Sequence, residues 1–443
     1  SVGVNSLYTA TTASNNTAVG YYSLFSNTTG AQNVAVGLNA LYYNTTASNN
    51  TAVGRSALQD NTTGANNTAT GFYSLEANTT GTQNSAVGSY ALALNTTGGY
   101  NIALGVNSLY YNTAGSYNTG LGVSALQSNT TGDNNTASGH AASYSNTTGG
   151  QNTSSGYKAL YFNTTGSDNT AFGKDALKAN TTASNNTAVG RNALYANTTG
   201  ADNVAVGLST LYYNTTGHSN TAVGKDALQS NTTGTSNTGT GYRAGLGVTT
   251  GYSNTLIGYR AGYYSTDITT GTKNVIVGAY SRASSATAIA AIGIGYDINA
   301  GAGYTTVGQS SSDIRAAHGV ATWNTVSDER YKKDIVDSTA GLSFVNALQP
   351  RTFKYKNLGE LPTTFNAYEE GSTEVFKNSN TNHGFIAQEV KAAIDADSSI
   401  KDGFKLWDDR EDGSQEVAEA ALIPVLVKAI QELSAKVTAL ESE

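Results

Sequence analysis

The chain has 443 residues, with 24 Lys and Arg against 31 Asp and Glu, and it contains no cysteine and no methionine. The lack of cysteine excludes disulfides and thiolate metal sites, and no apolar run approaches the roughly 18 residues that span a membrane. The mildly acidic balance does not suggest nucleic-acid binding, for which a basic surface is expected. We therefore expect no cofactor, no metal ion, no nucleic-acid partner and no membrane insertion.

The charges divide the chain near residue 326. Residues 1–326 hold 11 Lys and Arg against 10 Asp and Glu, whereas residues 327–443 hold 13 against 21. All three prolines also lie in the second part. The sequence therefore predicts a fibrous first part joined to an ordinary charged domain.

The first part repeats with a fixed period. A glycine recurs every 17 residues from Gly3 to Gly258, which gives 16 copies of a unit close to N-T-A-V-G-x-x-A-L-x-x-N-T-T-G-x-x. So short a period indicates that each copy forms one coil of a solenoid. We predict a mostly β fold, with a repeat shaft over residues 1–262.

Each unit contains strand, core and turn signals. The T-A-V before the repeat glycine and the Ala-Leu after it are expected to be strand, with the small alanine and its larger neighbours on opposite faces. Leucine follows the glycine by four residues in 13 of the first 14 copies, failing only at Ser143, and we interpret it as the core stack. N-T-T-G is the expected turn, because Asn and Gly accept left-handed backbone. The same turn chemistry, rather than glycosylation, accounts for the N-x-T sequons of Asn15, Asn27 and Asn44.

Such a coil has little interior. Burial of one Val and one Leu falls well short of the conformational entropy lost by 17 backbones. We therefore infer that several chains share the core, and the predicted fold is a trimeric parallel β-roll or solenoid. The unit resembles the left-handed parallel β-roll repeats in the heads of trimeric autotransporter adhesins and similar arrays in bacteriophage tail fibres.

The repeat becomes irregular after Gly258. The next glycines of this type are Gly278, Gly295 and Gly308, so the spacing is no longer constant. Residues 263–326 are predicted to form either a modified tip or a cap and adaptor, which the end of a repeat array needs in any case.

Four sequence blocks mark the last part. They are W-N-T-V-S-D-E-R-Y-K-K-D-I from Trp323, L-Q-P-R-T-F-K-Y-K over Leu348–Lys356, H-G-F-I-A-Q-E-V over His383–Val390, and the apolar helix at the end. In this order they resemble the intramolecular chaperone domain of the endosialidase type, the peptidase S74 family. The resemblance spans residues 327–443 and implies a small α+β domain ending in a coiled coil.

The resemblance also implies a single self-cleavage. In this family the domain trimerises, guides a fibre into register and then cuts itself off, which on this chain places the scissile bond at Val326–Ser327. Ser327 would be the nucleophile, Lys332 its basic partner, Asp328 an orienting group and Arg330 a positive neighbour. A lysine accepts a proton only as a neutral amine, so this hypothesis expects Lys332 in a dry or electropositive pocket.

Simpler interpretations stay open for these residues. Ser327 and Asp328 followed by Glu329 are also typical of a helix N-terminus, with acidic side chains near its positive end. The resemblance also aligns His383 with a position implicated in cleavage, whereas a lone histidine is more often structural. The enzyme activity would in any case be one autoproteolytic event per chain, with no external substrate.

The final segment, 422–441, predicts an amphipathic helix with a heptad seam. β-branched residues alternating with leucine favour two strands in an isolated coiled coil, but the seam is short and we let the surrounding domain set three. A helix packed on its own domain is the alternative. The seam residues are Ile423, Leu426, Ile430, Leu433, Val437 and Leu440.

The sequence thus predicts the fibre of a bacteriophage tail, located extracellularly on the virion. Its partners would be two further copies in a homotrimer, a host cell-surface glycan or protein receptor, and other tail proteins bound through a missing N-terminal segment. The alternatives are a bacterial trimeric surface adhesin and a glycan-cleaving tailspike, the latter opposed by the scattered carboxylates of the shaft. Aromatic pairs that could contact glycans, or only stack between coils, are Tyr42-Tyr43, Tyr110-Tyr111, Tyr161-Phe162 and Tyr212-Tyr213.

Overall fold

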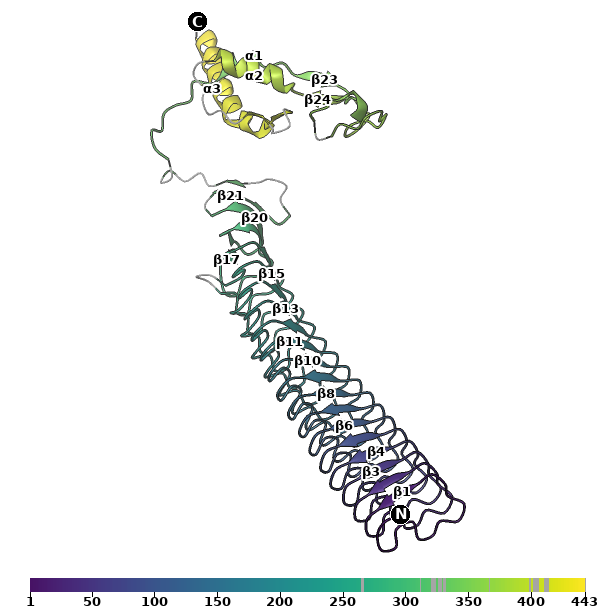
Figure 1. Ribbon diagram of the computed structural model, residues 1–443. Coiled ribbons are helices and arrows are strands. Elements are labelled where there is room, and N and C mark those ends of the chain that lie inside the picture. Colours follow the sequence, from purple (N-terminus) through teal and green to yellow (C-terminus); the bar gives the residue numbers. More distant parts are fainter. Residues whose placement is uncertain are drawn as a thin grey trace. The chain divides into compact units, whose positions relative to one another are not determined.

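The computed structural model of the chain consists of two compact units, Ser1–Val326 and Ser327–Glu443. The structure describes residues 1–263, 267–310, 312–319, 324–325, 329, 332–365, 367–397, 400, 406–409 and 414–442. Figure 1 shows the first unit as a stack of coils and the second as a group of helices and short strands.

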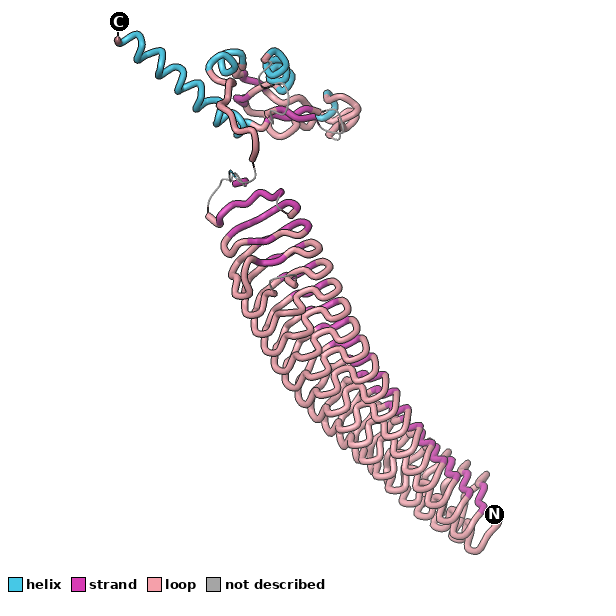
Figure 2. The backbone as a smooth tube through the Cα atoms, turned by 90° about the vertical axis from the view of Figure 1, so that its left-hand side faces the viewer, coloured by secondary structure: helices cyan, strands magenta, loops and turns pink. Residues whose placement is uncertain are grey.

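The first unit is a parallel β-solenoid with one short strand in each coil. Each strand pairs in parallel with the strand one coil away, so that Ala18 lies opposite Ala35, and Ala35 opposite Ala52. Figure 2 shows these strands stacked as a column along the solenoid. The solenoid fold predicted from the period is therefore confirmed. The strands are β1 (Thr17–Val19), β2 (Val34–Val36), β3 (Thr51–Val53), β4 (Thr68–Thr70), β5 (Ser85–Val87), β6 (Ile102–Leu104), β7 (Thr119–Leu121), β8 (Thr136–Ser138), β9 (Thr153–Ser155), β10 (Thr170–Phe172), β11 (Thr187–Val189), β12 (Val204–Val206), β13 (Thr221–Val223), β14 (Thr238–Thr240), β15 (Thr255–Ile257) and β16 (Val275–Val277).

The repeat glycines form a column of their own because no side chain fits there. Gly20 has φ +133°, and a Cβ on it would lie 2.5 Å from the carbonyl oxygen of Gly37 in the next coil. The same contact recurs along the stack, which explains why the period tolerates no other residue at this position.

The leucine stack is buried as predicted, but its backbone is not a strand. Leu24 is fully buried, has φ +51°, and its N–H donates to the carbonyl of Ala40 in the next coil at 2.9 Å. Left-handed backbone is costly for leucine, yet Ser143 adopts it too, with φ +48°. The coil path therefore imposes this conformation, and the prediction that Ala-Leu continues the strand was wrong.

The solenoid interior is closed within one chain. From Leu24 onward the stacked leucines, and the central residue of each regular strand, are buried without any partner chain, as for Leu58 and Ala52. The inference that several chains must share this core was therefore wrong, because it counted only apolar burial and overlooked a polar contribution to the interior.

That polar contribution is two ladders of buried asparagines. In the first, Asn44 Nδ2 donates to Asn27 Oδ1 at 2.9 Å and to the carbonyl of Ala47 at 3.1 Å, and the pattern repeats coil by coil through Asn231. In the second, the backbone N–H of Asn50 donates to Asn33 Oδ1 at 3.0 Å. Asn27 and Asn44, considered above as sequons, are fully buried in the first ladder. Within the ladders each amide bonds to the neighbouring coils, and only Asn231 Oδ1, at the end of the first ladder, is a ladder oxygen buried without a hydrogen-bond partner. The stack therefore removes most of the cost of burying these polar groups.

The aromatic pairs divide between two roles. The first ring of a pair stacks on the coils beside it, as Tyr42 does on Phe25 at 5.1 Å between ring centroids. The second ring packs edge-on against the first and stays half exposed, as in Tyr43, which is 50% exposed. Stacking between coils therefore explains only one ring of each pair.

Beyond Gly258 the coils continue and then end in an antiparallel turn-back. β15 pairs with β16, β16 with β18 (Ile292–Tyr296), and β18 with β20 (Tyr304–Gln309), all in parallel. β21 (Ser312–Ala317) then pairs antiparallel with β20 and with β22 (Asn324–Thr325). A parallel pair formed by β17 (Arg282–Ala283) and β19 (Asn299–Ala300) lies in the same irregular coils. The antiparallel strands cover the hydrogen-bonding edge of the last coil, which an open stack would leave unpaired.

The second unit is a small α+β domain. Its helices are α1 (Leu342–Ala347), α2 (Ala387–Ala396) and α3 (Leu422–Glu441), and its strand pairs are β23 (Arg351–Phe353) with β24 (Asn382–Gly384) and β25 (Trp407–Asp409) with β26 (Gln415–Val417). Short 3₁₀ turns occupy Leu358–Glu360 and Glu419–Ala421. Its core is formed by Ala340, Phe344, Val390, Ala393, Ile394, Leu406, Leu422 and Val425. Within the described residues, no helix is both long and apolar enough to cross a membrane.

Candidate functional site

Two of the four sequence blocks meet in the second unit through strand pairing and an ion pair. β23 and β24 are antiparallel, with Thr352 opposite His383. Arg351 on β23 donates to both carboxylate oxygens of Glu389 on α2, Nε to Oε2 at 2.9 Å and Nη2 to Oε1 at 2.7 Å. These hydrogen bonds lower the pKa of Glu389 below its ordinary value. The bidentate pair holds α2 against β23.

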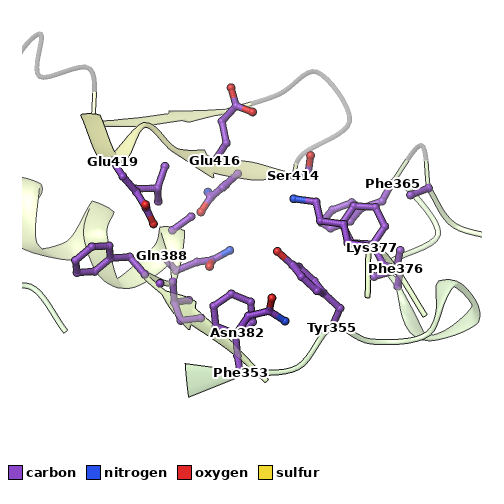
Figure 3. A pocket seen from close by; sticks show the side chains of 18 of the residues that line it. Phe353, Tyr355, Phe365, Phe376, Lys377, Asn382, Gln388, Ser414, Glu416 and Glu419 are labelled. Atoms are coloured by element: carbon purple, nitrogen blue, oxygen red, sulfur yellow. The ribbon is translucent and has the colours of Figure 1, made fainter. Parts of the chain in front are cut away.

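A pocket of about 830 Å³ opens beside this strand pair. Aromatic rings line one side, and Tyr355 packs edge-on against Phe353 and Phe376 at 5.4 and 5.6 Å between centroids. Lys377 Nζ lies 5.3 Å from the centre of the Tyr355 ring. Glu416 and Glu419 also line the pocket, and Figure 3 shows Glu419 across it from Phe365 and Phe376, with the Glu416 carboxylate directed away from Tyr355. The pocket therefore combines an apolar wall with charged groups of both signs.

The terminal helix α3 has one face packed on its own unit and one face without a described partner. Leu422, Val425 and Ala429 are buried, and Glu432 Oε2 accepts a 2.8 Å hydrogen bond from the backbone N–H of Leu342 at the start of α1. The predicted seam lies on the other face and is exposed, with solvent-exposed fractions from 42% at Leu426 to 72% at Leu440. One face of this helix therefore packs on its own unit, and the coiled-coil seam on the other face stays a prediction.

Comparison with known families decides what this unit is. Residues 327–397 match the model of a family described as chaperone of endosialidase, peptidase S74. The C-terminal unit carries an endosialidase-chaperone domain. Neither a curated protein nor a solved structure is similar enough to the chain to count as a match. The family implies trimeric assembly, and a β-solenoid followed by this chaperone domain indicates a tail-fibre-like or tailspike-like protein.

The structure describes only some of the residues predicted for cleavage. Val326, Ser327, Asp328 and Arg330 lie outside the described residues. The match begins at residue 327, where the two compact units also divide. The cleavage hypothesis therefore places its bond between the solenoid and the chaperone domain.

Lys332 and His383 are described, and both are exposed. The backbone N–H of Lys332 donates to the carbonyl of Glu329 at 2.9 Å. Lys332 is therefore not enclosed by the residues that the structure describes, and the dry pocket expected around it stays a prediction. His383 lines the aromatic pocket from β24. Among the described residues, no group of His, Cys, Asp or Glu is arranged to hold a metal ion.

Sequence reasoning missed the contacts that hold the domain together. Arg351 and Glu389 both stood in the blocks used for the resemblance, but their pairing depends on how β23 and α2 meet. Glu432 lies between Ile430 and Leu433 of the seam, and nothing in the sequence around it predicts its hydrogen bond to Leu342. For the first pair, the only hint in the sequence is that Arg351 and Glu389 carry opposite charges.

Proposed function

We propose that this chain is the fibre protein of a bacteriophage tail, acting extracellularly to attach the virion to a host cell. The solenoid would form the shaft, and the chaperone domain would hold three chains level while the coils assemble. The organisation of the chain supports this proposal, because a long shaft of near-identical coils is joined directly to a chaperone domain.

Near-identical coils create the problem that the chaperone would solve. Two chains displaced by one coil make almost the same contacts as two chains in register, so little energy distinguishes the correct alignment. A C-terminal clamp would align the chain ends before the coils pair. The exposed seam of α3 supports this role, because it offers apolar residues on 3 and 4 spacing to two further copies.

The chaperone domain would then be released by cleavage at Val326–Ser327. The Ser327 hydroxyl would attack the Val326 carbonyl while Lys332 takes its proton, and the peptide C–N bond would break to give an ester and the Ser327 amine, which takes up a proton. Water would then hydrolyse the ester and separate the two parts, with Asp328, Arg330 and His383 as candidate supporting groups. Because Lys332 is exposed in the single chain, we infer that the water-excluding environment it needs arises only when three chains assemble. Cleavage would then follow assembly and act as its checkpoint, leaving the shaft kinetically trapped in its folded form.

A denaturing gel tests release directly. Wild type is expected to give two bands, whereas Ser327→Ala and Lys332→Ala are each expected to give one full-length band. Lys333→Ala changes the neighbouring lysine and is the matched control, expected to be cleaved, at most more slowly. Full-length wild type after complete assembly would contradict self-cleavage, and loss of cleavage in the control alone would reassign the base.

Host contact would be made by the exposed side chains of the shaft. The half-exposed second rings of the aromatic pairs support a glycan or protein receptor on this surface, since Tyr43, Tyr111, Phe162 and Tyr213 repeat on a rigid support. Labelled antibody against the shaft should decorate purified virions. Labelling of the bacterial envelope in uninfected cells would instead favour the surface-adhesin alternative.

A further inference from the structure

The outward face of the solenoid strands is uncharged along the whole stack. In each strand the middle residue points inward and the first and third point outward, as the burial of Thr187, Ala188 and Val189 shows for β11. We call the outward residues of β1–β16 the strand face. No residue of the strand face is charged, whereas every charged residue of positions 1–262 lies in the turns.

The strand face is also apolar over most of its length. The third residue of the strand is Val, Leu, Ile or Phe in 12 of the 16 strands, and Thr or Ser in the rest. None of these side chains is buried in the single chain: most are exposed, by 39% at Val19, 50% at Leu104 and 45% at Phe172, and the rest are half-buried. The apolar members are Val19, Val36, Val53, Val87, Leu104, Leu121, Phe172, Val189, Val206, Val223, Ile257 and Val277.

A parallel sheet with one bare face is unusual. Parallel sheets are normally covered on both faces, and their strands are then rich in Val, Ile and Leu. The inner face here is covered by the leucines and asparagines of the coil, but each described strand of β1–β16 pairs only with the coils above and below it. An exposed apolar patch of this length marks an interaction surface.

The geometry points to further copies of this chain as the occupant: we propose that three parallel chains pack through their strand faces. A partner that covers the face must be as long as the shaft and must present one matching row per coil, about 4.8 Å apart. A second copy in register meets both conditions. The trimeric assembly implied by the chaperone family gives the same partner independently.

This inference rests on the trimer proposed above and adds which surface of each chain forms the interface. Each chain keeps its own closed interior, and the shared apolar surface lies between coils rather than within them. Because the strand face presents β-branched residues and threonines at every coil, a one-coil shift would change the contacts little, which is why a separate aligning domain is needed.

Charge placed on the strand face tests the inference in the full chain. Val189→Glu introduces a carboxylate in the middle of the shaft, and Thr182→Glu puts the same charge on an exposed turn of the same coil. By light scattering at micromolar concentration, wild type and Thr182→Glu are expected to contain three chains. Val189→Glu is expected to lose the three-chain species, because three carboxylates would be buried together without partners.

Cross-linking gives a second measurement that does not depend on a disruptive substitution. The native chain has no cysteine, so Val189→Cys and Thr182→Cys each carry a single thiol. A short bis-maleimide should join chains of Val189→Cys and leave those of Thr182→Cys mostly single. If Val189→Glu fails to fold, this comparison decides the question.

The outcomes separate the inference from the proposed function. A single-chain wild type would overturn both the trimer and its interface. A three-chain wild type whose Val189→Glu variant keeps three chains and an unchanged unfolding temperature, with Val189→Cys not cross-linked, would overturn the strand face as the interface and leave the trimer standing.

Discussion

The shaft and the chaperone domain differ in which groups they bury and which they leave at the surface. In the shaft, asparagines are buried in hydrogen-bonded ladders inside each coil, and valines are left on the outside. In the chaperone domain, apolar residues fill the core and the charged pair of Arg351 and Glu389 lies at the surface. The shaft is therefore specified one coil at a time, whereas the chaperone domain depends on contacts between distant segments.

On the proposed function, this difference would explain why the two parts need each other. Because every shaft coil has the same neighbours, the repeat specifies the fold of one coil but not which coils of two chains should pair. The chaperone domain is not repetitive and carries the predicted seam, so it would set the alignment of the chains. The following variants test that division.

The largest effect is expected at the seam. Ile430→Glu places a carboxylate in the middle of the exposed apolar row of α3, while Gln431→Glu puts it one residue away, off the seam. Ile430→Glu should abolish three-chain assembly of the full chain, and with it cleavage, as judged by light scattering and denaturing gel. Normal assembly of the Ile430 variant would show that the helix does not align the chains.

A smaller but still severe effect is expected in the glycine column. A Cβ on Gly156, which has φ +131°, would lie 2.7 Å from the carbonyl carbon and oxygen of Gly173. Backbone strain and overpacking together should make Gly156→Ala destabilising by roughly 2–6 kcal/mol. Gly150→Ala is the control in the preceding turn, where the nearest atom is 3.2 Å away. Thermal unfolding should separate the two, and equal midpoints would contradict the close-packing argument.

The asparagine ladder should respond next. Asn163 donates to Asn146 Oδ1 and accepts from Asn180 Nδ2, both at 2.8 Å. Asn163→Ala leaves both neighbours short of a buried partner, at about 1–3 kcal/mol for each group. Thr165→Ala changes an exposed turn residue nearby and is expected to have little effect. Hydrogen exchange should rise in the coils around residue 163 in the first variant, and unchanged protection there would mean that the ladder is not stabilising.

The smallest effect is expected for the surface ion pair. Because hydrogen bonds from Arg351 lower the pKa of Glu389, the pair stabilises the folded domain above the ordinary glutamate pKa of about 4.3 and the benefit fades as pH falls below it. Arg351→Ala should slightly lower the unfolding temperature of the chaperone domain at pH 7 and change it little near pH 3. If the difference in unfolding temperature between wild type and Arg351→Ala grew as the pH was lowered, the ion pair would not stabilise the domain in this way.

The sequence predicted the coil better than it predicted what fills it. The constant spacing of Gly20 and its equivalents, and the leucine four residues later, sufficed for the solenoid, because each position repeats with its local environment. The asparagines were interpreted as turn residues alone, because their burial is satisfied only by amides one coil away, as for Asn44 on Asn27, and a single repeat does not show that contact. In the chaperone domain, the blocks around Arg351 and His383 predicted the family but not the pocket or the ion pair, which arise from contacts between segments.

Refolding measures most directly whether the C-terminal unit assembles the shaft. The cleavage-blocked Ser327→Ala chain and the shaft released from wild type would each be denatured, diluted into native buffer and weighed by light scattering. The account predicts that the blocked chain regains an ordered three-chain particle and that the released shaft does not. A released shaft that refolds unaided into the same particle would contradict it.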